Sequence, residues 1–271
     1  MAQSVQPVIE QAPESEERRT RVPLRACPAP ELGENALIVV PTYNERANLQ
    51  ALVSAVLRAA PGAQLLIVDD ASPDGTGALA DVLAVRDARV AVLHRARKLG
   101  LGTAYVAGFR WGLKRGFQRF FEMDADFSHD PRQLLRFFAA LDGGADVVVG
   151  SRNIRGGSIS GWGVGRRFLS KGGSAYSRVV LGVSTRDLTT GYKAFTRRAL
   201  ERLRLESVCS NGYAFQIETT FRALRAGMQV VEVPITFVDR RVGQSKMDRR
   251  IFLEAISVVW RLRFDALRRK L

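Results

Sequence analysis

The pair of carboxylates Asp124 and Asp126, separated by one alanine, is the part of this sequence best suited to chemistry. The pair directly follows residues 119–123, an apolar run that is typical of a buried strand. An aspartate at the end of a strand more often caps a turn than binds a ligand, so this spacing alone is weak evidence. Its meaning depends on which other polar residues the fold brings to the same place.

Strand and helix patterns alternate on both sides of this pair. Short apolar runs predict strands at residues 36–40, 64–68, 89–94, 119–123 and 146–150. Apolar residues at helical spacing predict helices at residues 48–59, 77–85, 103–115 and 134–141. This alternation predicts an α/β fold with a single open, mostly parallel, twisted sheet and helices on both faces. In such a sheet, ligands bind at the carboxyl ends of the strands.

Four of the predicted strands end in polar clusters, at residues 41–45, 69–76, 124–126 and 150–153, and three of these clusters contain carboxylates. The carboxyl ends of the strands form one edge of the sheet, which we call the rim. Carboxylates that meet at this rim repel one another unless a cation or hydrogen-bond donors lie between them. Hard oxygen ligands suit Mg²⁺ or Mn²⁺, which also bind the phosphates of a substrate. We therefore expect a divalent metal and a phosphorylated substrate at this rim. The chain has no G-x-G-x-x-G after its first strand and no P-loop motif, which argues against a dinucleotide cofactor.

The composition favours one large domain with an anionic partner. The chain has 271 residues, of which 46% are hydrophobic, and a net charge of +14. The charge does not choose among nucleic acid, phosphorylated small molecules and an anionic membrane surface. The sequence contains no run of about 18 apolar residues, so no transmembrane helix is predicted. No secretory signal is visible at its N-terminus. The two cysteines lack the spacing of a metal site or a disulfide scaffold, which favours a cytoplasmic setting.

The sequence divides into three predicted parts. Residues 1–34 are rich in Glu, Pro, Gln and Arg without any period, which predicts a disordered tail. Residues 35–240 contain the alternating pattern and are expected to form the catalytic domain. Residues 241–271 are expected to form a basic flap and a C-terminal amphipathic helix.

Eight segments of the chain, in order, resemble the inverting family 2 glycosyltransferases of GT-A fold. The segments are VVPTYNE, IVDDASPDGT, KLGLGTAYVAGF, MDADFSHDP, VVGSRN, DLTTGYKAF, GYAFQIE and VPITFVDRRVGQSKM. Within this family they look most like the dolichol-phosphate, or polyprenol monophosphate, mannose synthases, over about residues 36–263. The resemblance implies GDP-mannose as the donor, a polyprenyl phosphate as the acceptor, Mg²⁺ or Mn²⁺ as the cofactor and a β-linked product.

The resemblance also implies which residues hold the donor nucleoside. By position, Pro41, Tyr43 and Glu45 would hold it. Val68 and Asp70 would lie beside it, at the end of the second strand. These five residues belong to the same rim that the strand pattern predicts.

The acidic segment would meet the ribose and the diphosphate through Asp124, Ala125 and Asp126. Asp126 would be the direct metal ligand, and Asp124 is the second candidate. Ser128 stands where some relatives have a metal-binding Gln, so water is the alternative ligand at that position. At this residue the chain departs from those relatives.

Three cationic residues, Arg152, Arg240 and Lys246, match family positions that meet the diphosphate, the sugar or the acceptor phosphate. Together with Asp126 they form the expected catalytic set, in which positive charge stabilises the leaving diphosphate. The second pKa of a phosphate monoester is about 6, so the acceptor phosphate is a nucleophile near neutral pH and requires no protein base. For Arg240 and Lys246, a solvated basic loop is the alternative interpretation.

Two amphipathic stretches suit the surface of an anionic membrane. Residues 158–182 mix aromatic and aliphatic side chains with Arg and Lys, and residues 252–270 have an apolar stripe among cations. Packing of each apolar face on the protein's own core is the alternative. We expect peripheral association with the cytoplasmic face of a membrane, with a separate membrane-anchoring subunit as a further partner to test.

Two other functions stay open at this point. The first keeps the fold and the lipid acceptor but uses UDP-glucose or another nucleotide sugar as the donor. The second is a non-catalytic basic module that binds a membrane or nucleic acid. Because the three acidic clusters would repel nucleic acid, we expect no nucleic-acid partner.

Overall fold

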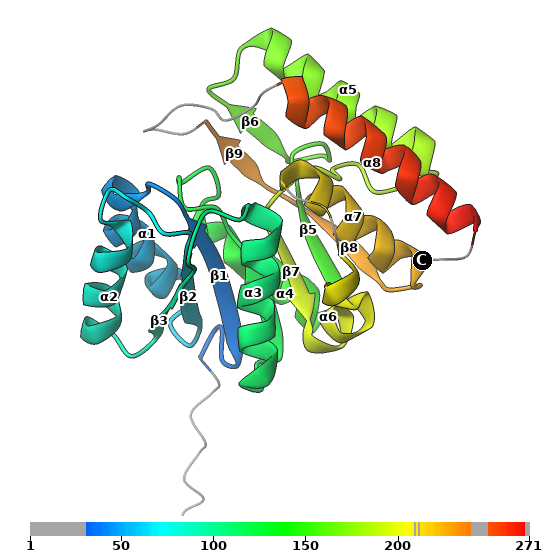
Figure 1. Ribbon diagram of the computed structural model, residues 1–271. Helices are drawn as coiled ribbons and strands as arrows, with labels where there is room; N and C mark the ends of the chain where they lie inside the picture. Colours follow the sequence, from blue (N-terminus) through cyan, green and yellow to red (C-terminus); the bar gives the residue numbers. More distant parts are fainter. Residues whose placement is uncertain (1–30, 209, 211, 240–248, 269–271) are drawn as a thin grey trace, which may run out of the picture.

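A seven-stranded sheet forms the centre of the molecule (Figure 1). The computed structural model describes residues 31–208, 210, 212–239 and 249–268. In these residues the strand order is β3-β2-β1-β4-β7-β5-β8. The strands are β1 (Ala36–Thr42), β2 (Gln64–Asp69), β3 (Val90–His94), β4 (Arg119–Glu122), β5 (Val147–Ser151), β7 (Lys193–Thr196) and β8 (Val230–Pro234). Only β7 runs antiparallel to its neighbours in this sheet, so the predicted mostly parallel α/β architecture is confirmed.

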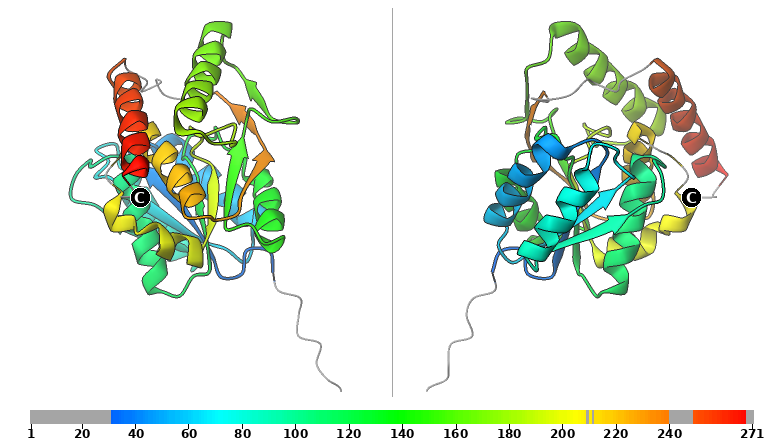
Figure 2. Two further views of the ribbon diagram at one scale, coloured as in Figure 1. Left: turned by 90° about the vertical axis from the view of Figure 1, so that its right-hand side faces the viewer. Right: turned by 60° about the vertical axis from the view of Figure 1, so that its left-hand side comes forward.

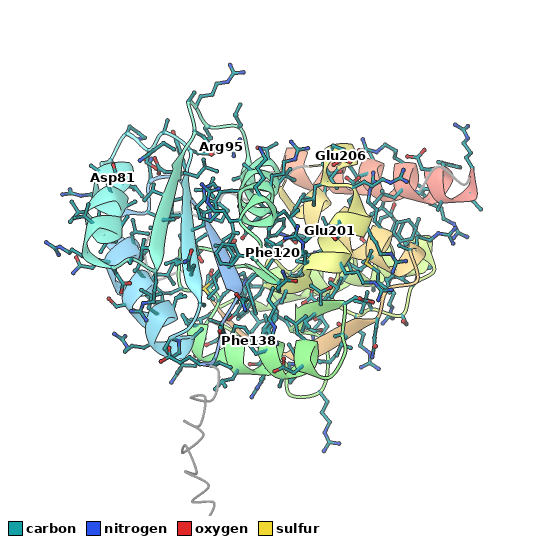
Figure 3. The ribbon with its side chains drawn as sticks, turned by 90° about the horizontal axis from the view of Figure 1, so that it is seen from below. Asp81, Arg95, Phe120, Phe138, Glu201 and Glu206 are labelled. Carbon is teal, nitrogen blue, oxygen red and sulfur yellow. The ribbon has the colours of Figure 1, made fainter. Side chains whose placement is uncertain are left out.

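Helices cover both faces of the sheet, which is why β1 and β2 are almost continuously apolar. One face carries α1 (Arg46–Ala59), α2 (Thr76–Arg86) and α4 (Leu134–Asp142), and the other carries α3 (Leu101–Lys114), α6 (Arg197–Leu203) and α7 (Gly212–Arg225). Successive β1 residues alternate between the faces, so Ile38 packs in the first layer and Leu37 in the second. Phe138 and Phe120 mark these same two layers (Figure 3).

Small residues on α3 let this helix lie close against β1. A Cβ atom at Gly108 would lie only 2.5 Å from Val39 Cγ1, and Gly112 makes a similarly close approach. Close packing of this kind leaves no room for a side chain at either position. The approach brings the buried ring of Tyr105, one turn before Gly108, to the end of β4, where its hydroxyl reaches Asp124.

Two further helices, α5 (Val164–Leu181) and α8 (Arg249–Leu267), lie side by side next to α7 (Figure 1, Figure 2). The three helices share an apolar cluster that includes Leu181 of α5, Phe221 of α7, and Val259 and Leu262 of α8. One face of the C-terminal helix therefore packs on the protein's own core, as the alternative interpretation of its sequence predicted. The described part of α8 also has an outward face, which is considered below with the membrane.

A second, two-stranded sheet lies beyond the carboxyl end of the main sheet. Its parallel strands are β6 (Ser158–Ser160) and β9 (Thr236–Val238). Two short 3-10 helices, η1 (Pro131–Gln133) and η2 (Leu205–Ser207), complete the described elements. The predicted amphipathic stretch 158–182 thus contains a strand and a helix. Most of the predicted tail, residues 1–30, lies outside the described residues.

Candidate active site

Asp69 joins the end of β1 to the loop that follows β2, at the carboxyl edge of the sheet. Its buried carboxylate accepts hydrogen bonds from Thr42 Oγ1 (2.9 Å), Ser72 Oγ (2.6 Å) and the Ser72 backbone N–H (3.0 Å). These protein donors satisfy the carboxylate without a ligand. Asp69 therefore shapes the rim.

Four residues predicted to hold the nucleoside lie at these adjacent strand ends. Pro41 and Val68 are partners in the register of β1 and β2. Tyr43 and Glu45 follow β1 directly, and the Lys98 ammonium lies 4.1 Å from the centroid of the Tyr43 ring. A cation at this distance is attracted to the face of an aromatic ring. The structure thus brings the four residues together, and their contact with a nucleoside stays a prediction.

Asp70, the fifth residue predicted at the nucleoside, is paired within the protein. Arg95 Nη1 lies 2.9 Å from its Oδ1, and the backbone N–H of Leu99 donates to its Oδ2 (3.2 Å). The contact with Arg95 lacks hydrogen-bond geometry at Oδ1, so it is an ion pair. Both side chains are mostly buried. Asp70 therefore fixes the loop after β3, and the pair adds no net charge to the rim.

The acid loop, residues 124–129, carries the carboxylates predicted to hold a metal. The Tyr105 hydroxyl donates to Asp124 Oδ1 (3.3 Å), and the Ser128 backbone N–H donates to Asp126 Oδ1 (3.0 Å). Asp126 and Ser128 are buried, whereas the Asp124 side chain is 31% exposed. Asp124 is thus accessible at the rim, and Asp126 is more enclosed. Ala125, between them, is also buried.

The described residues contain no group of three or more His, Cys, Asp and Glu side chains arranged to hold a metal ion. The acid loop offers the two carboxylates of Asp124 and Asp126, one residue apart. Mg²⁺ is usually bound by one or two carboxylates, with its other positions taken by water and substrate phosphates. The donor set therefore fits a metal that is shared with a diphosphate, and it does not form a complete protein cage.

His129 ends the acid loop and contacts its start. His129 Nδ1 accepts a hydrogen bond from the Asp124 backbone N–H (3.2 Å), and the imidazole ring stacks on Tyr192 with centroids 4.8 Å apart. Burial lowers the pKa of His129 to about 4, although the nearby Asp126 carboxylate opposes this effect. The ring is therefore neutral at neutral pH, and the 3.9 Å approach of Nδ1 to Asp124 Oδ2 is not an ion pair.

Arg152 directly follows β5 and forms a buried ion pair with Asp187. Arg152 donates from its backbone N, Nε and Nη2 to the Asp187 carboxylate over 2.8 to 3.0 Å, and Nη2 also donates to Thr189 Oγ1 (2.9 Å). Burial alone would raise the pKa of Asp187, but the Arg152 charge and its hydrogen bonds hold it below the ordinary value. Arg152 thus lies at the end of β5, and its Nε and Nη2 groups already donate hydrogen bonds within the protein.

Arg240 and Lys246, the other two cations of the predicted catalytic set, lie outside the described residues. Their roles at the diphosphate or the acceptor phosphate stay predictions. The same holds for the predicted basic flap, most of which falls within residues 240–248.

Comparison with known proteins decides the family. A family model described as "Glycosyl transferase family 2" matches residues 37–204, which is more than half of the chain. The chain belongs to glycosyltransferase family 2. The predicted family is thereby confirmed, and the matched span contains all the predicted site residues that the structure describes.

Two curated relatives resemble this glycosyltransferase over most of their length. It is 51% identical over 233 residues to "Polyprenol monophosphomannose synthase" of Mycolicibacterium smegmatis, covering 85% of this chain and 88% of that protein. It is 47% identical over 239 residues to "Undecaprenyl-phosphate mannosyltransferase" of Micrococcus luteus, covering 87% of this chain and 98% of that protein. Both names describe mannosyl transfer to a polyprenol-type lipid by those proteins.

Solved structures share the fold of this glycosyltransferase. Glucosyl-3-phosphoglycerate synthase from Mycobacterium tuberculosis, solved with Mn²⁺, uridine diphosphate and phosphoglyceric acid, superposes with a TM-score of 0.63 at 18% identity. The match covers 85% of this chain and 79% of that chain. The likeness confirms the predicted GT-A type of α/β fold. No helix among the described residues of the glycosyltransferase is both long and apolar enough to span a bilayer.

Close to the acid loop, the enzyme buries an acid and a base that the sequence analysis did not select. Glu122 and Lys193 are register partners on β4 and β7. Burial raises the pKa of Glu122 to about 7 and lowers that of Lys193 to about 8, because it disfavours both charged forms. The Lys193 ammonium donates to the Gln216 backbone oxygen (2.6 Å) and to Thr219 Oγ1 (3.1 Å). The available signal was a glutamate between the buried apolar residues Phe121 and Met123.

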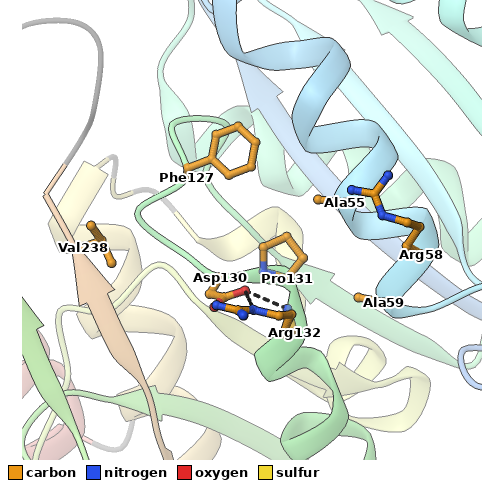
Figure 4. Close-up of a pocket in the computed structure, with 8 residues that line it drawn as sticks. All are labelled: Ala55, Arg58, Ala59, Phe127, Asp130, Pro131, Arg132 and Val238. Carbon is orange, nitrogen blue, oxygen red and sulfur yellow. Dashed lines mark hydrogen bonds and ion pairs between the residues drawn. The ribbon is translucent and has the colours of Figure 1, made fainter.

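A hollow of about 480 Å³ adjoins the acid loop between α1 and β9 (Figure 4). Its lining consists of Ala55, Arg58, Ala59, Phe127, Asp130, Pro131, Arg132 and Val238. Within it, the Asp130 carboxylate already pairs with the Arg132 guanidinium at 2.7 Å. The hollow shows that the face of the acid loop toward α1 is not packed solid.

Proposed function

We propose that this enzyme transfers mannose from GDP-mannose to a polyprenyl phosphate and forms polyprenyl phosphate β-mannose with inversion. The observation that carries the proposal is 51% identity, over 85% of the chain, to a polyprenol monophosphomannose synthase. The rim supports it, because accessible and buried carboxylates lie at the end of β4 and the predicted nucleoside residues lie at the ends of β1 and β2. A nucleoside diphosphate requires both kinds of contact.

Within this proposal, Asp126 and Asp124 hold Mg²⁺ or Mn²⁺ together with the donor diphosphate. The two-carboxylate donor set of the acid loop supports this choice. When bound, a divalent cation supplies positive charge that stabilises the leaving diphosphate. Ser128 is buried, and water is the alternative ligand at its position. Tyr105 holds the Asp124 carboxylate through its hydroxyl.

The acceptor phosphate is the nucleophile in this reaction. One of its oxygens bonds to the anomeric carbon of mannose while the bond from that carbon to the donor diphosphate breaks, and GDP leaves. Because the phosphate is largely dianionic near pH 7, no proton transfer to a protein base is required. The proposed protein contribution is positioning and positive charge, from Arg152 and from Arg240 and Lys246.

The outward face of α8 supports a proposed peripheral site on the cytoplasmic face of an anionic membrane. Trp260, Phe264 and Leu267 are 46%, 52% and 66% exposed, and their spacing puts them on one side of the helix. Arginines at 261, 263 and 268 accompany them. An aromatic stripe among cations suits the lipid headgroup region. A separate membrane-anchoring subunit is a proposed partner for the same region.

Product analysis with two donors tests the proposed reaction. Purified enzyme would be incubated with one polyprenyl phosphate, Mn²⁺ or Mg²⁺, and either GDP-mannose or UDP-glucose, and the lipid product analysed by mass spectrometry with glycosidic linkage analysis. We expect a hexosyl phospholipid from GDP-mannose only. Product from UDP-glucose alone would refute the donor, and no lipid product from any nucleotide sugar would refute the reaction.

A further inference from the structure

We propose that His129 is a positioning residue, which closes the acid loop through Nδ1 and joins this loop to β9 so that the Asp124 and Asp126 carboxylates are held for the donor. The inference rests on the proposed function only in that the acid loop is taken to bind a nucleoside diphosphate with its metal. No contact of His129 with substrate is part of it.

The hydrogen bond to Nδ1 defines the chemical state of the ring. Nδ1 accepts from the Asp124 backbone N–H over 3.2 Å, so the ring proton must lie on Nε2. The side chain is only 1% exposed, which excludes direct access by substrate. His129 thus links the first and last residues of the loop that contains both carboxylates.

The acid loop needs such a link because its conformation is strained. Phe127, between Asp126 and Ser128, has a positive φ of 61°, in the left-handed region. For a residue other than glycine, this conformation is unfavourable and persists only when its surroundings hold it. Among the described contacts, the Ser128 N–H bond to Asp126 Oδ1 and the closure by His129 help to hold this turn.

Aromatic rings fix the imidazole in place. Tyr192 stacks on it with an interplanar angle of 22°, and Phe237 of β9 meets it edge-on with ring centroids 5.8 Å apart. Tyr192 in turn donates from its hydroxyl to the Asp130 backbone oxygen (3.2 Å). The ring therefore cannot turn away from the Asp124 amide without disturbing Tyr192 and Phe237.

The backbone extends the link from the acid loop to β9. His129 and Phe237 form an isolated antiparallel bridge, and the Val238 N–H donates to the Ser128 oxygen (3.3 Å). The Phe237 ring also lies 5.3 Å from the Arg152 guanidinium carbon. His129 thus couples the carboxylates of the acid loop to the strand that lies against the Arg152 side of the rim.

Three variants distinguish the contribution of the Nδ1 acceptor from the contribution of the aromatic ring. His129→Phe keeps an aromatic ring for Tyr192 but removes the acceptor, whereas His129→Asn keeps an acceptor near the position of Nδ1. His94→Phe, at the other histidine of the chain, is the matched control, because His94 is 51% exposed and pairs with Asp81. Binding of GDP and of UDP with Mn²⁺ would be measured by calorimetry, together with the KM for donor and for lipid.

We expect His129→Phe to weaken nucleotide binding with Mn²⁺ by about 10- to 100-fold, as loss of residues that orient metal ligands usually does. His129→Asn should stay within a few-fold of the native enzyme, His94→Phe should match it, and the KM for the lipid should change little in all three. Native-like binding by folded His129→Phe, or equal losses in His129→Phe and His129→Asn, would overturn the proposal.

A measurement on the native enzyme keeps the test independent of how the variants fold. The ¹⁵N spectrum of the His129 imidazole at pH 7 should show the proton on Nε2, and a proton on Nδ1 would overturn the proposal. Neither this spectrum nor the nucleotide titration requires sugar transfer. Failure of the proposed mannosyl transfer is therefore distinguishable from failure of the inference about His129.

Discussion

Replacement of Asp187 by alanine would test the buried ion pair that holds Arg152. The pair is joined by three hydrogen bonds of 2.8 to 3.0 Å, and its side chains are 4% and 0% exposed. Removal of one partner of a buried pair leaves an uncompensated charge and costs about 3–5 kcal/mol. Because a domain is usually stable by only about 5–15 kcal/mol, Asp187→Ala should lose a large share of the stability.

The double variant Arg152→Met with Asp187→Leu provides the internal comparison. Both variants leave the backbone N–H groups of Arg152 and Thr189 without the Asp187 acceptor, but the double variant buries no unpaired charge, so we expect a smaller loss than in Asp187→Ala. Urea unfolding followed by circular dichroism at pH 7 would measure the free energy of unfolding of each variant. A loss below about 1 kcal/mol in Asp187→Ala would match an exposed ion pair and would refute the reasoning.

The pH dependence of stability provides a second check on the same pair. The pKa of Asp187 is lower in the folded protein than its ordinary value of about 3.9. Its contribution to stability is thus fully present above that ordinary value and is lost as the pH falls through the folded pKa. The native enzyme should therefore lose more stability below about pH 4 than Asp187→Ala does. Equal losses of stability by the two proteins at acid pH would contradict this prediction.

Three further predictions follow from the described contacts. Gly108→Ala should lose about 1–3 kcal/mol in urea unfolding because α3 cannot move off β1 freely, whereas Gly173→Ala, with open space around it, should not; equal effects would contradict the packing. Tyr105→Phe should lose about 1 kcal/mol and raise the donor KM but not the lipid KM, and an unchanged donor KM would show that Asp124 needs no such support. Trp260→Ser should weaken sedimentation with anionic vesicles several-fold while unfolding changes by less than about 0.5 kcal/mol, and unchanged sedimentation would argue against the membrane face.

The first half of the fold could be predicted from the sequence because its elements are local. Alternating apolar runs predict β1 to β5 and α1 to α4 to within a few residues, and α1 begins at Arg46 where position 48 was predicted. The short strand β7 could not be predicted in this way. It has four residues, and its place between β4 and β5 is set by pairing with distant residues.

The candidate site was predictable where it depends on strand ends. Pro41 and Asp124 belong to the polar clusters at predicted strand ends, where ligands bind to a parallel sheet, whereas Val68 was selected through the family resemblance. The partners of charged residues did not follow, because nothing local shows that Arg152 pairs with Asp187, 35 positions later. Arg152 was expected to meet the diphosphate, the sugar or the acceptor phosphate, and its bonds to Asp187 show that part of its hydrogen-bonding capacity serves the fold.

The buried pair Glu122 and Lys193 shows a similar limit of sequence reasoning. A glutamate in the strand before the acid loop conflicts with the apolar pattern, and only the register of β4 with β7 supplies the opposite charge. His129 likewise acquires its role from Tyr192 and Phe237, which come from two distant segments. Contacts between distant segments are the part of the site that spacing cannot reveal.

The most direct test of the proposed function is the rate of polyprenyl phosphate mannosylation by the native enzyme and by Asp126→Asn over a range of Mn²⁺ concentrations. We expect a metal-dependent rate for the native enzyme and a loss on the order of 100-fold or more in Asp126→Asn, with an unchanged circular dichroism spectrum. Transfer by Asp126→Asn at the native rate would contradict the role of the acid loop, and the absence of any mannosyl lipid from the native enzyme would contradict the function.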